Sequence, residues 1–219
     1  MTRAEVRVRI EEIGIIPALR VASAEQAFFG AEAVYQAGIP VAEITNTVPD
    51  AAGVIYKLAK RFPDMVVGGG TVLDAETARR CLDAGAKFLT SPGLVPEVVE
   101  FARKNDVVVF PGALTPTEVI AAWKAGVDFV KVFPCEPVGG HTYIRSLKAA
   151  LPQIPLIATG GVNQSSAVNF ILAGAAALGI GAELIPREAL QRRKQEQIHE
   201  LARRYLRMIK QARERKAGK

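Results

Sequence analysis

The stretch Val127–Pro134, with the sequence VDFVKVFP, places a single lysine, Lys131, in the middle of an apolar run. Its Val and Phe content and its short length predict a buried strand of a parallel sheet, and Pro134 ends that strand because it has no backbone N–H to donate. A lysine in such a strand is paired, neutral or reactive, because an unpaired charge among apolar side chains is costly. Burial favours the neutral amine, which can attack a ketone, so we predict that Lys131 is reactive.

The segments on both sides of this strand repeat one order of strand and helix. After a leading helix at residues 3–12, eight strands are expected at residues 14–20, 40–46, 65–70, 87–91, 107–110, 127–134, 156–158 and 176–179. Helices are expected between them, and several begin at capping residues such as Ser23, Asp74 and Thr115. The chain therefore alternates strand and helix from beginning to end.

Four Ala-Gly pairs mark helix ends at a regular spacing. Their glycines, separated by 47, 41 and 48 residues, are Gly38, Gly85, Gly126 and Gly174. Eight units in about 180 residues favour a closed (β/α)₈ TIM barrel over an open doubly wound sheet, and no G-x-G-x-x-G follows the first strand. We predict an α/β fold with one domain, 1–219: a barrel at about 14–185, a short N-terminal helix and an extra basic C-terminal helix at about 193–215.

A second charge stands in an apolar strand. Glu43 lies among Val41, Ala42 and Ile44. A carboxylate near a desolvated lysine can move the protons that Schiff-base chemistry requires. The alternative is an ion pair of Glu43 with Lys131 or Arg20 that only neutralises the interior.

Further polar and glycine residues fall at the ends of predicted strands. Arg20, Thr71 and Pro92 do so, and an arginine fork there suits a carboxylate or a phosphate. Glycine-rich turns follow the seventh and eighth strands, at Thr159–Asn163 and Gly179–Ala182. Barrels often bind phosphate through backbone N–H groups at such turns, so we expect a phosphate there, and the alternative is tight turns alone.

Composition excludes several other classes of protein. The chain is 49% hydrophobic and 23% charged, as expected for a globular protein, and it has no apolar run of membrane-spanning length. Residues 1–12 are charged and lack the apolar core of a signal peptide, so we expect a cytoplasmic protein without a membrane partner.

Cys81 and Cys135 form no metal-type spacing, and no histidine adjoins Cys135, which we interpret as a bystander thiol.

The positive charge belongs to the C-terminal segment. Residues 187–219 carry 12 of the 28 Lys+Arg and 4 of the 22 Asp+Glu, a net of +8, which leaves −2 for residues 1–186. An apolar stripe at helical spacing runs through the segment and consists of Ile198, Leu201, Ala202, Tyr205, Met208, Ile209 and Ala212. We predict a helix docked on the barrel or on a neighbouring subunit, with no nucleic-acid partner; an RNA or membrane contact is the alternative.

With these residues in view, the chain resembles the 2-keto-3-deoxy-6-phosphogluconate (KDPG) / 4-hydroxy-2-oxoglutarate (KHG) aldolase family of class I aldolases. The resemblance runs from about Gly14 to Ile185. The segments that carry it are Ile16–Arg20 (IPALR), Glu43–Thr45 (EIT), Gly68–Leu73 (GGGTVL), Ser91–Gly93 (SPG), Pro111–Gly112 (PG), Thr115–Glu118 (TPTE), Lys131–Pro134 (KVFP) and Thr159–Val162 (TGGV).

This resemblance implies roles for individual residues. Lys131 would form the Schiff base with pyruvate, and Glu43 would act as general acid/base. The residues expected to bind substrate are Arg20, Thr47, Thr71, Pro92, Phe133, Thr159, Gly160, Gly161, Gly181 and Ala182. The resemblance also implies a homotrimer without a metal, and no cofactor is expected.

The chain departs from the family pattern at two positions. Many members have an arginine at the position of Thr47, where it holds the substrate carboxylate, and a serine at the position of Ala182, where it contributes to phosphate binding. We expect Arg20 to take over the first task. Neither change touches Lys131 or Glu43, so the aldol chemistry is expected to persist. The sequence does not determine which aldehyde is the acceptor.

We therefore predict an aldolase that reversibly cleaves a 2-keto-4-hydroxy acid, such as KDPG or KHG, to pyruvate and an aldehyde. The aldehyde would be glyceraldehyde 3-phosphate or glyoxylate. A sugar-phosphate isomerase or epimerase barrel is the competing enzyme hypothesis, and it gives Lys131 no covalent task. A non-enzymatic module that binds nucleic acid through the basic tail is the hypothesis from another class.

Overall fold

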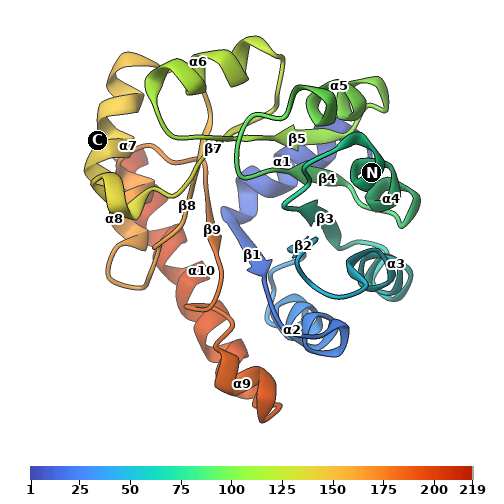
Figure 1. Ribbon diagram of the computed structural model, residues 1–219. Helices are drawn as coiled ribbons and strands as arrows, with labels where there is room; N and C mark the ends of the chain where they lie inside the picture. Colours follow the sequence, from blue (N-terminus) through green and yellow to red (C-terminus); the bar gives the residue numbers. More distant parts are fainter. Residues whose placement is uncertain (219) are drawn as a thin grey trace.

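The computed structural model describes residues 1–218, which form nine short parallel strands (Figure 1). The strands are β1 (Ile15–Leu19), β2 (Val41–Thr45), β3 (Val66–Gly70), β4 (Phe88–Thr90), β5 (Val108–Phe110), β6 (Gly112–Ala113), β7 (Val130–Val132), β8 (Leu156–Thr159) and β9 (Ala177–Ile180). Every strand pairing in the sheet is parallel.

The sheet closes on itself at Pro111. The strand order is β5-β4-β3-β2-β1-β9-β8-β7-β6, and only Pro111 separates β5 from β6 in the chain. The N–H of Asp128 donates to the carbonyl of Val109 at 3.1 Å, and the N–H of Lys131 donates to that of Pro111 at 3.0 Å. β5 and β6 are therefore one strand interrupted by a proline, and the predicted eightfold barrel is confirmed.

Helices surround the barrel, as Figure 1 shows. They are α1 (Arg3–Ile13), α2 (Ala24–Gln36), α3 (Ala51–Arg61), α4 (Ala75–Asp83), α5 (Pro96–Lys104), α6 (Pro116–Lys124), α7 (Gly140–Ala150), α8 (Ala167–Leu172), α9 (Arg187–Gln191) and α10 (Gln195–Ala217), with a 3₁₀ turn at η1 (Glu136–Val138). The side chains of Ser23, Asp74 and Thr115 cap their helices as predicted. Each of the four Ala-Gly pairs ends in a glycine with positive φ, which closes the helix before it.

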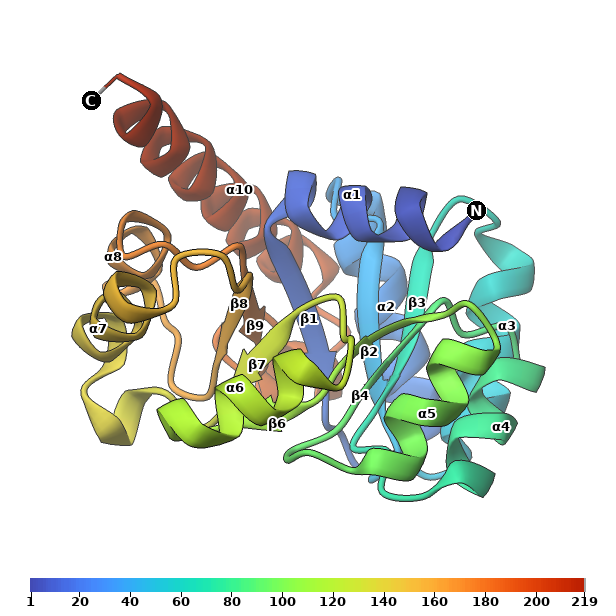
Figure 2. The same ribbon diagram turned by 90° about the horizontal axis from the view of Figure 1, so that it is seen from above.

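The N-terminal end of the barrel is filled with apolar side chains and covered by α1. Figure 2 shows α1 lying across the end where the strands begin. The interior cluster consists of Val6, Ile10, Ile16, Val41, Val66, Phe88, Val108, Phe110, Phe129, Ile157 and Ala177. Arg3 fixes the helix there, because its Nε and Nη2 donate to the two carboxylate oxygens of Asp128 at 2.9 and 3.0 Å.

The C-terminal helix α10 docks on the outer wall, against α8 and α2. The inner part of its predicted apolar stripe is buried, namely Ile198, Ala202, Tyr205, Ile209 and Ala212. Its arginines Arg203, Arg204 and Arg207 are exposed. The prediction of a docked basic helix is thus confirmed.

Several predicted boundaries differ from the structure. β7 is confined to Val130–Val132 rather than 127–134, because the side chain of Asp128 turns to Arg3 and to the N–H of Val109. α9 was not predicted, since five residues are too few to show a helical period. No helix formed by residues 1–218 has both the length and the apolar character needed to cross a membrane.

Candidate active site

The barrel interior changes from apolar to polar within two residues along its strands. Alternate residues of a barrel strand point inward. On the chain through β7, Phe129 lies in the apolar interior cluster and Lys131 is the next inward residue. On β2, Val41 and Glu43 are related in the same way. The two charges that the sequence placed in separate strands therefore occupy the same layer.

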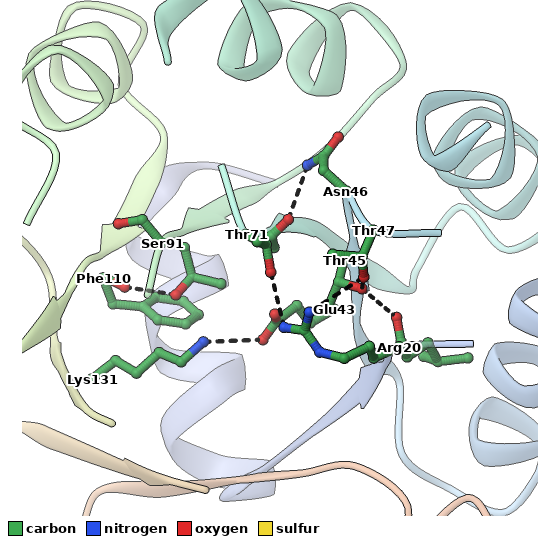
Figure 3. A network of polar contacts seen from close by, with 12 residues as sticks. Arg20, Glu43, Thr45, Asn46, Thr47, Thr71, Ser91, Phe110 and Lys131 are labelled. Carbon is green, nitrogen blue, oxygen red and sulfur yellow. Dashed lines mark hydrogen bonds and ion pairs between the residues drawn. The ribbon is translucent and has the colours of Figure 1, made fainter. Parts of the chain in front are cut away.

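Lys131 and Glu43 face each other across this layer (Figure 3). Lys131 Nζ lies 3.8 Å from Glu43 Oε2, and the two residues are only 7% and 3% exposed. Nζ also lies 5.5 Å from the centre of the Phe133 ring. A separation of 3.8 Å is too long for a direct hydrogen bond, so the amine is close to a carboxylate without being tied to it.

Glycines provide the volume that these polar side chains occupy. Gly70 ends β3 beside β2, and a Cβ on Gly70 would overlap the carboxylate of Glu43. A Cβ on Gly179 would likewise overlap the hydroxyl of Thr159. Glycine is required at these two positions because each lies against a polar side chain, even though neither glycine has a positive φ.

Arg20, at the end of β1, is held by hydroxyl groups. Its Nη1 donates to Thr47 Oγ1 at 3.3 Å, and its Nη2 donates to Thr71 Oγ1 at 3.1 Å. Thr71 has a φ of 56°, a left-handed conformation that is unusual for a β-branched residue and that is typical of strained functional positions. Among the contacts of the described residues, Glu43 pairs with Lys131 and not with Arg20.

The residues surround a cavity of about 460 Å³ at the C-terminal ends of the strands. The predicted site residues that line it are Arg20, Glu43, Thr71, Pro92, Lys131, Phe133, Thr159, Gly160, Gly161, Gly181 and Ala182. Thr47 contacts Arg20 but is not among the lining residues. The polar layer is thus open to a small molecule, which a purely structural ion pair would not require.

A larger groove of about 960 Å³ lies on the outer surface between α2 and α3. It is lined by Phe28, Phe29 and Tyr56, and its lysines, Lys57 and Lys60, are exposed. It lacks a buried pair of charges, so the smaller cavity is the candidate active site.

The sequence did not identify Thr45, Glu183 and Arg187 as lining residues. The inward position of Thr45 could have been found from its spacing of two from Glu43. Arg187 could not, because it lies on the unpredicted helix α9. Its exposed guanidinium adds a cation at the mouth of the cavity, beside Ala182 and Glu183.

Cys135 behaves as a structural residue. It is fully buried, and its Sγ donates to the carbonyl of Gly160 at 3.3 Å. Burial raises the pKa of its thiol to about 11, so little thiolate exists at neutral pH. This agrees with its interpretation as a bystander thiol.

The glycine turn after β8 has the geometry of an exposed backbone loop. Gly160 and Gly161 have φ values of 90° and 89°, and a Cβ on Gly161 would overlap the side chain of Glu136. The next helix, α8, begins only at Ala167 and has six residues. Any anion bound here would therefore depend on the N–H groups of the turn more than on a helix end.

Comparison with known proteins places this chain in a family. Residues 6–201 match the family described as KDPG and KHG aldolase. The chain belongs to the KDPG/KHG aldolase family. The match extends beyond residues 14–185 and includes α9 and the start of α10, so the expectation that the resemblance ends near Ile185 is wrong.

Individual members of the KDPG/KHG aldolase family match over nearly the whole chain. A 2-dehydro-3-deoxy-phosphogluconate aldolase of Haemophilus influenzae is 28% identical over 210 residues, which cover 95% of this chain and 99% of that protein. The KDPG aldolase of Legionella pneumophila, solved with pyruvate captured at low pH as a covalent carbinolamine, is 28% identical with a TM-score of 0.83, covering 90% and 96% of the two chains.

A designed protein has a similar fold. It is a cube-shaped, highly porous cage made by fusing symmetric oligomeric domains, and one of its chains is 27% identical with a TM-score of 0.85. The likeness covers 94% of this chain and 76% of that chain.

Proposed function

We propose that this protein is a class I aldolase that reversibly cleaves a 2-keto-4-hydroxy acid, such as KDPG or KHG, to pyruvate and an aldehyde. The observation that carries the proposal is the buried pair of Lys131 Nζ and Glu43 Oε2, 3.8 Å apart at the base of an open cavity. The family assignment supports it, and so does the relative whose structure holds pyruvate as a covalent carbinolamine.

The chemistry begins at the amine of Lys131. Nζ attacks C2 of the keto acid to give a carbinolamine, which loses water to become an iminium ion. Glu43 is close enough to move protons in these steps, either directly as the substrate closes the gap or through one water. The amine is buried next to the apolar layer of the interior cluster and opens on the cavity.

Cleavage of the C3–C4 bond uses the iminium as an electron sink. The C4 hydroxyl gives its proton to Glu43, the aldehyde leaves, and the bonding electrons pass through C3 to form an enamine. Protonation at C3 and hydrolysis by water then release pyruvate and restore the free amine.

The substrate is held at both ends. Arg20 and Thr71 meet at one side of the cavity, where an arginine fork suits the carboxylate of the keto acid. The turn of Gly160 and Gly161 and the exposed Arg187 lie at the mouth, where backbone N–H groups and a cation suit an anionic acceptor. A phosphorylated substrate is therefore the better fit, although Ala182 supplies no hydroxyl.

The test is covalent trapping. Incubation with pyruvate and borohydride reduces an iminium to a stable secondary amine, which mass spectrometry locates. We expect one pyruvate-derived adduct on Lys131, none in Lys131→Arg, and normal trapping in Lys124→Arg, which changes an exposed lysine of α6. A full adduct in Lys131→Arg would assign the Schiff base to another lysine, and an isomerase or nucleic-acid-binding module would give no adduct in any variant.

We also propose that the enzyme is a homotrimer of the cytoplasm. The relative built from symmetric oligomeric domains supports an oligomer, and the two free buried cysteines suit a reducing compartment. Light scattering should give three times the 23.5 kDa mass of one chain. A mass of one chain at micromolar concentration would contradict the trimer.

A further inference from the structure

Two hydroxyl groups near Arg20, those of Thr45 and Thr47, form a hydrogen-bond chain whose direction is fixed. Thr45 Oγ1 donates to the carbonyl of Leu19 at 2.9 Å and lies 2.7 Å from Thr47 Oγ1. A threonine hydroxyl has one proton, and that of Thr45 is used on a carbonyl, which can only accept. Thr47 must therefore donate its own proton to Thr45.

This direction decides what Thr47 presents to Arg20. With its proton turned to Thr45, Thr47 Oγ1 offers a lone pair, and Arg20 Nη1 donates to it at 3.3 Å. The opposite arm, Nη2, donates to Thr71 Oγ1 at 3.1 Å. Figure 3 shows the guanidinium between Thr47 and Thr71, with Thr45 next to Thr47.

The hydrogen-bond chain ends at a backbone carbonyl directly before Arg20. Leu19, whose carbonyl ends the chain, is the last residue of β1 and directly precedes Arg20. Thr45 is 1% exposed and ends β2, so the anchor is rigid. Arg20 itself is exposed, and a free arginine side chain would occupy many rotamers.

Thr47 lies outside the lining of the cavity. Arg20, Thr45 and Thr71 line the cavity, whereas Thr47 is not among its lining residues. We propose that Thr47 is a positioning residue, which acts through Arg20 by orienting its guanidinium toward the substrate carboxylate. This proposal rests on the proposed function, because a keto acid supplies the carboxylate. It replaces the expectation that Thr47 binds substrate itself.

The experiment measures pyruvate binding apart from turnover. The quantity is the pyruvate concentration that gives half-maximal borohydride trapping, compared with the same quantity for methyl pyruvate, which has no carboxylate charge. Thr47→Val keeps the branched shape and removes the hydroxyl, while Thr47→Ser keeps the hydroxyl. Thr47 is exposed, so both variants are expected to fold, and thermal melting checks this.

Thr47→Val should raise the half-saturating pyruvate concentration about tenfold, as expected for a weakened hydrogen bond to a charged group. The concentration for methyl pyruvate should change less than about twofold, and Thr47→Ser should stay close to the original protein for both ligands. Equal effects on pyruvate and methyl pyruvate would overturn the proposal.

A double-mutant cycle tests whether Thr47 acts through Arg20. Arg20→Met alone should weaken pyruvate trapping on the order of a hundredfold, and adding Thr47→Val should then change it no further. Additive losses would overturn the positioning role and leave the aldolase assignment intact. Absence of trapping in the unmodified protein would instead overturn the proposed function and this inference together.

Discussion

The two ends of the barrel interior are made by the same strands and have opposite chemistry. At the N-terminal end, rings such as Phe88, Phe110 and Phe129 pack together, with Phe88 stacked on Phe110 at 5.1 Å between centroids. At the C-terminal end, Glu43 and Lys131 face an open cavity. The change takes two residues along a strand, from Phe129 to Lys131.

This contrast shows how one fold separates stability from reactivity. The apolar layer and α1 exclude water beneath the lysine, while glycines such as Gly70 leave room for polar groups above it. Changes at the N-terminal end of the barrel interior should therefore alter the melting temperature, and changes at its C-terminal end should alter turnover.

The largest expected effect concerns the outer wall of the barrel, where a change should alter thermal stability and not turnover. Truncation after Arg192 removes α10 and uncovers the apolar surfaces of α2 and α8. We expect the melting temperature to fall by about 10 °C or more, with kcat per folded molecule largely retained. Calorimetry and assays below the transition check both parts.

The control for this truncation is Arg203→Ala with Arg207→Ala, which removes exposed charge and keeps the stripe. The melting temperature of this double variant should be nearly unchanged. If the truncated protein melted as before and lost only affinity for nucleic acid, the basic tail would be a binding element.

Next in size is Phe129→Ala, which opens a cavity in the apolar layer. We expect a loss of about 3–5 kcal/mol in the free energy of unfolding, and kcat within about threefold below the transition. Urea unfolding measures the loss, and Tyr56→Ala, at a side chain that is 54% exposed, is the control. A large fall in kcat without loss of stability would show that the two ends are not separable.

Gly70→Ala tests the polar end without changing a reactive group. Its Cβ would displace the carboxylate of Glu43, so we expect turnover to fall about a hundredfold, the size of a general acid–base contribution. Pyruvate trapping should still occur, because Lys131 remains, but more slowly, because Glu43 also serves iminium formation. Gly93→Ala is the matched control, since a Cβ there meets open space. Equal turnover in the two variants would refute the role of Gly70.

At the mouth of the cavity the effect should be smaller. Ala182→Ser adds one hydroxyl beside the glycine turns, and we expect a three- to tenfold lower KM for a phosphorylated substrate with little change for an unphosphorylated one. Comparison of kcat/KM for both substrates measures this. Equal changes for both would mean that this end of the site does not recognise phosphate.

The smallest effect is expected at Tyr205, whose buried hydroxyl has no hydrogen-bond partner within residues 1–218. Burial raises the pKa of Tyr205 to about 12, from an ordinary value near 10. The folded state therefore holds the phenolic proton of Tyr205 more tightly than the unfolded state does. This difference stabilises the fold fully below pH 10, and the stabilisation is lost as the pH rises toward 12.

Tyr205→Phe should therefore flatten the fall of melting temperature between pH 10 and 12. At pH 7 it should leave the melting temperature unchanged or slightly higher, because it removes an unsatisfied polar group. Melting curves across this range provide the measurement, and a clear loss of stability at pH 7 would reveal a partner for the hydroxyl.

The sequence by itself determined the alternation of strands and helices, the barrel and the position of Lys131 and Glu43 inside apolar strands. These features depend on local periodicity, on caps such as Thr115 and Ser23, and on the rarity of charges in apolar strands. The stripe on the C-terminal helix was also sufficient to predict that it docks.

Other features were decided only by the tertiary structure. Closure of the barrel at Pro111, the short helix α9 with Arg187, and the direction of the Thr45–Thr47–Arg20 hydrogen bonds have no local pattern. Each depends on which strand ends lie side by side and on how much space a neighbouring residue leaves. These arrangements are set by the register and closure of the whole barrel, and no single segment of the sequence specifies either of them.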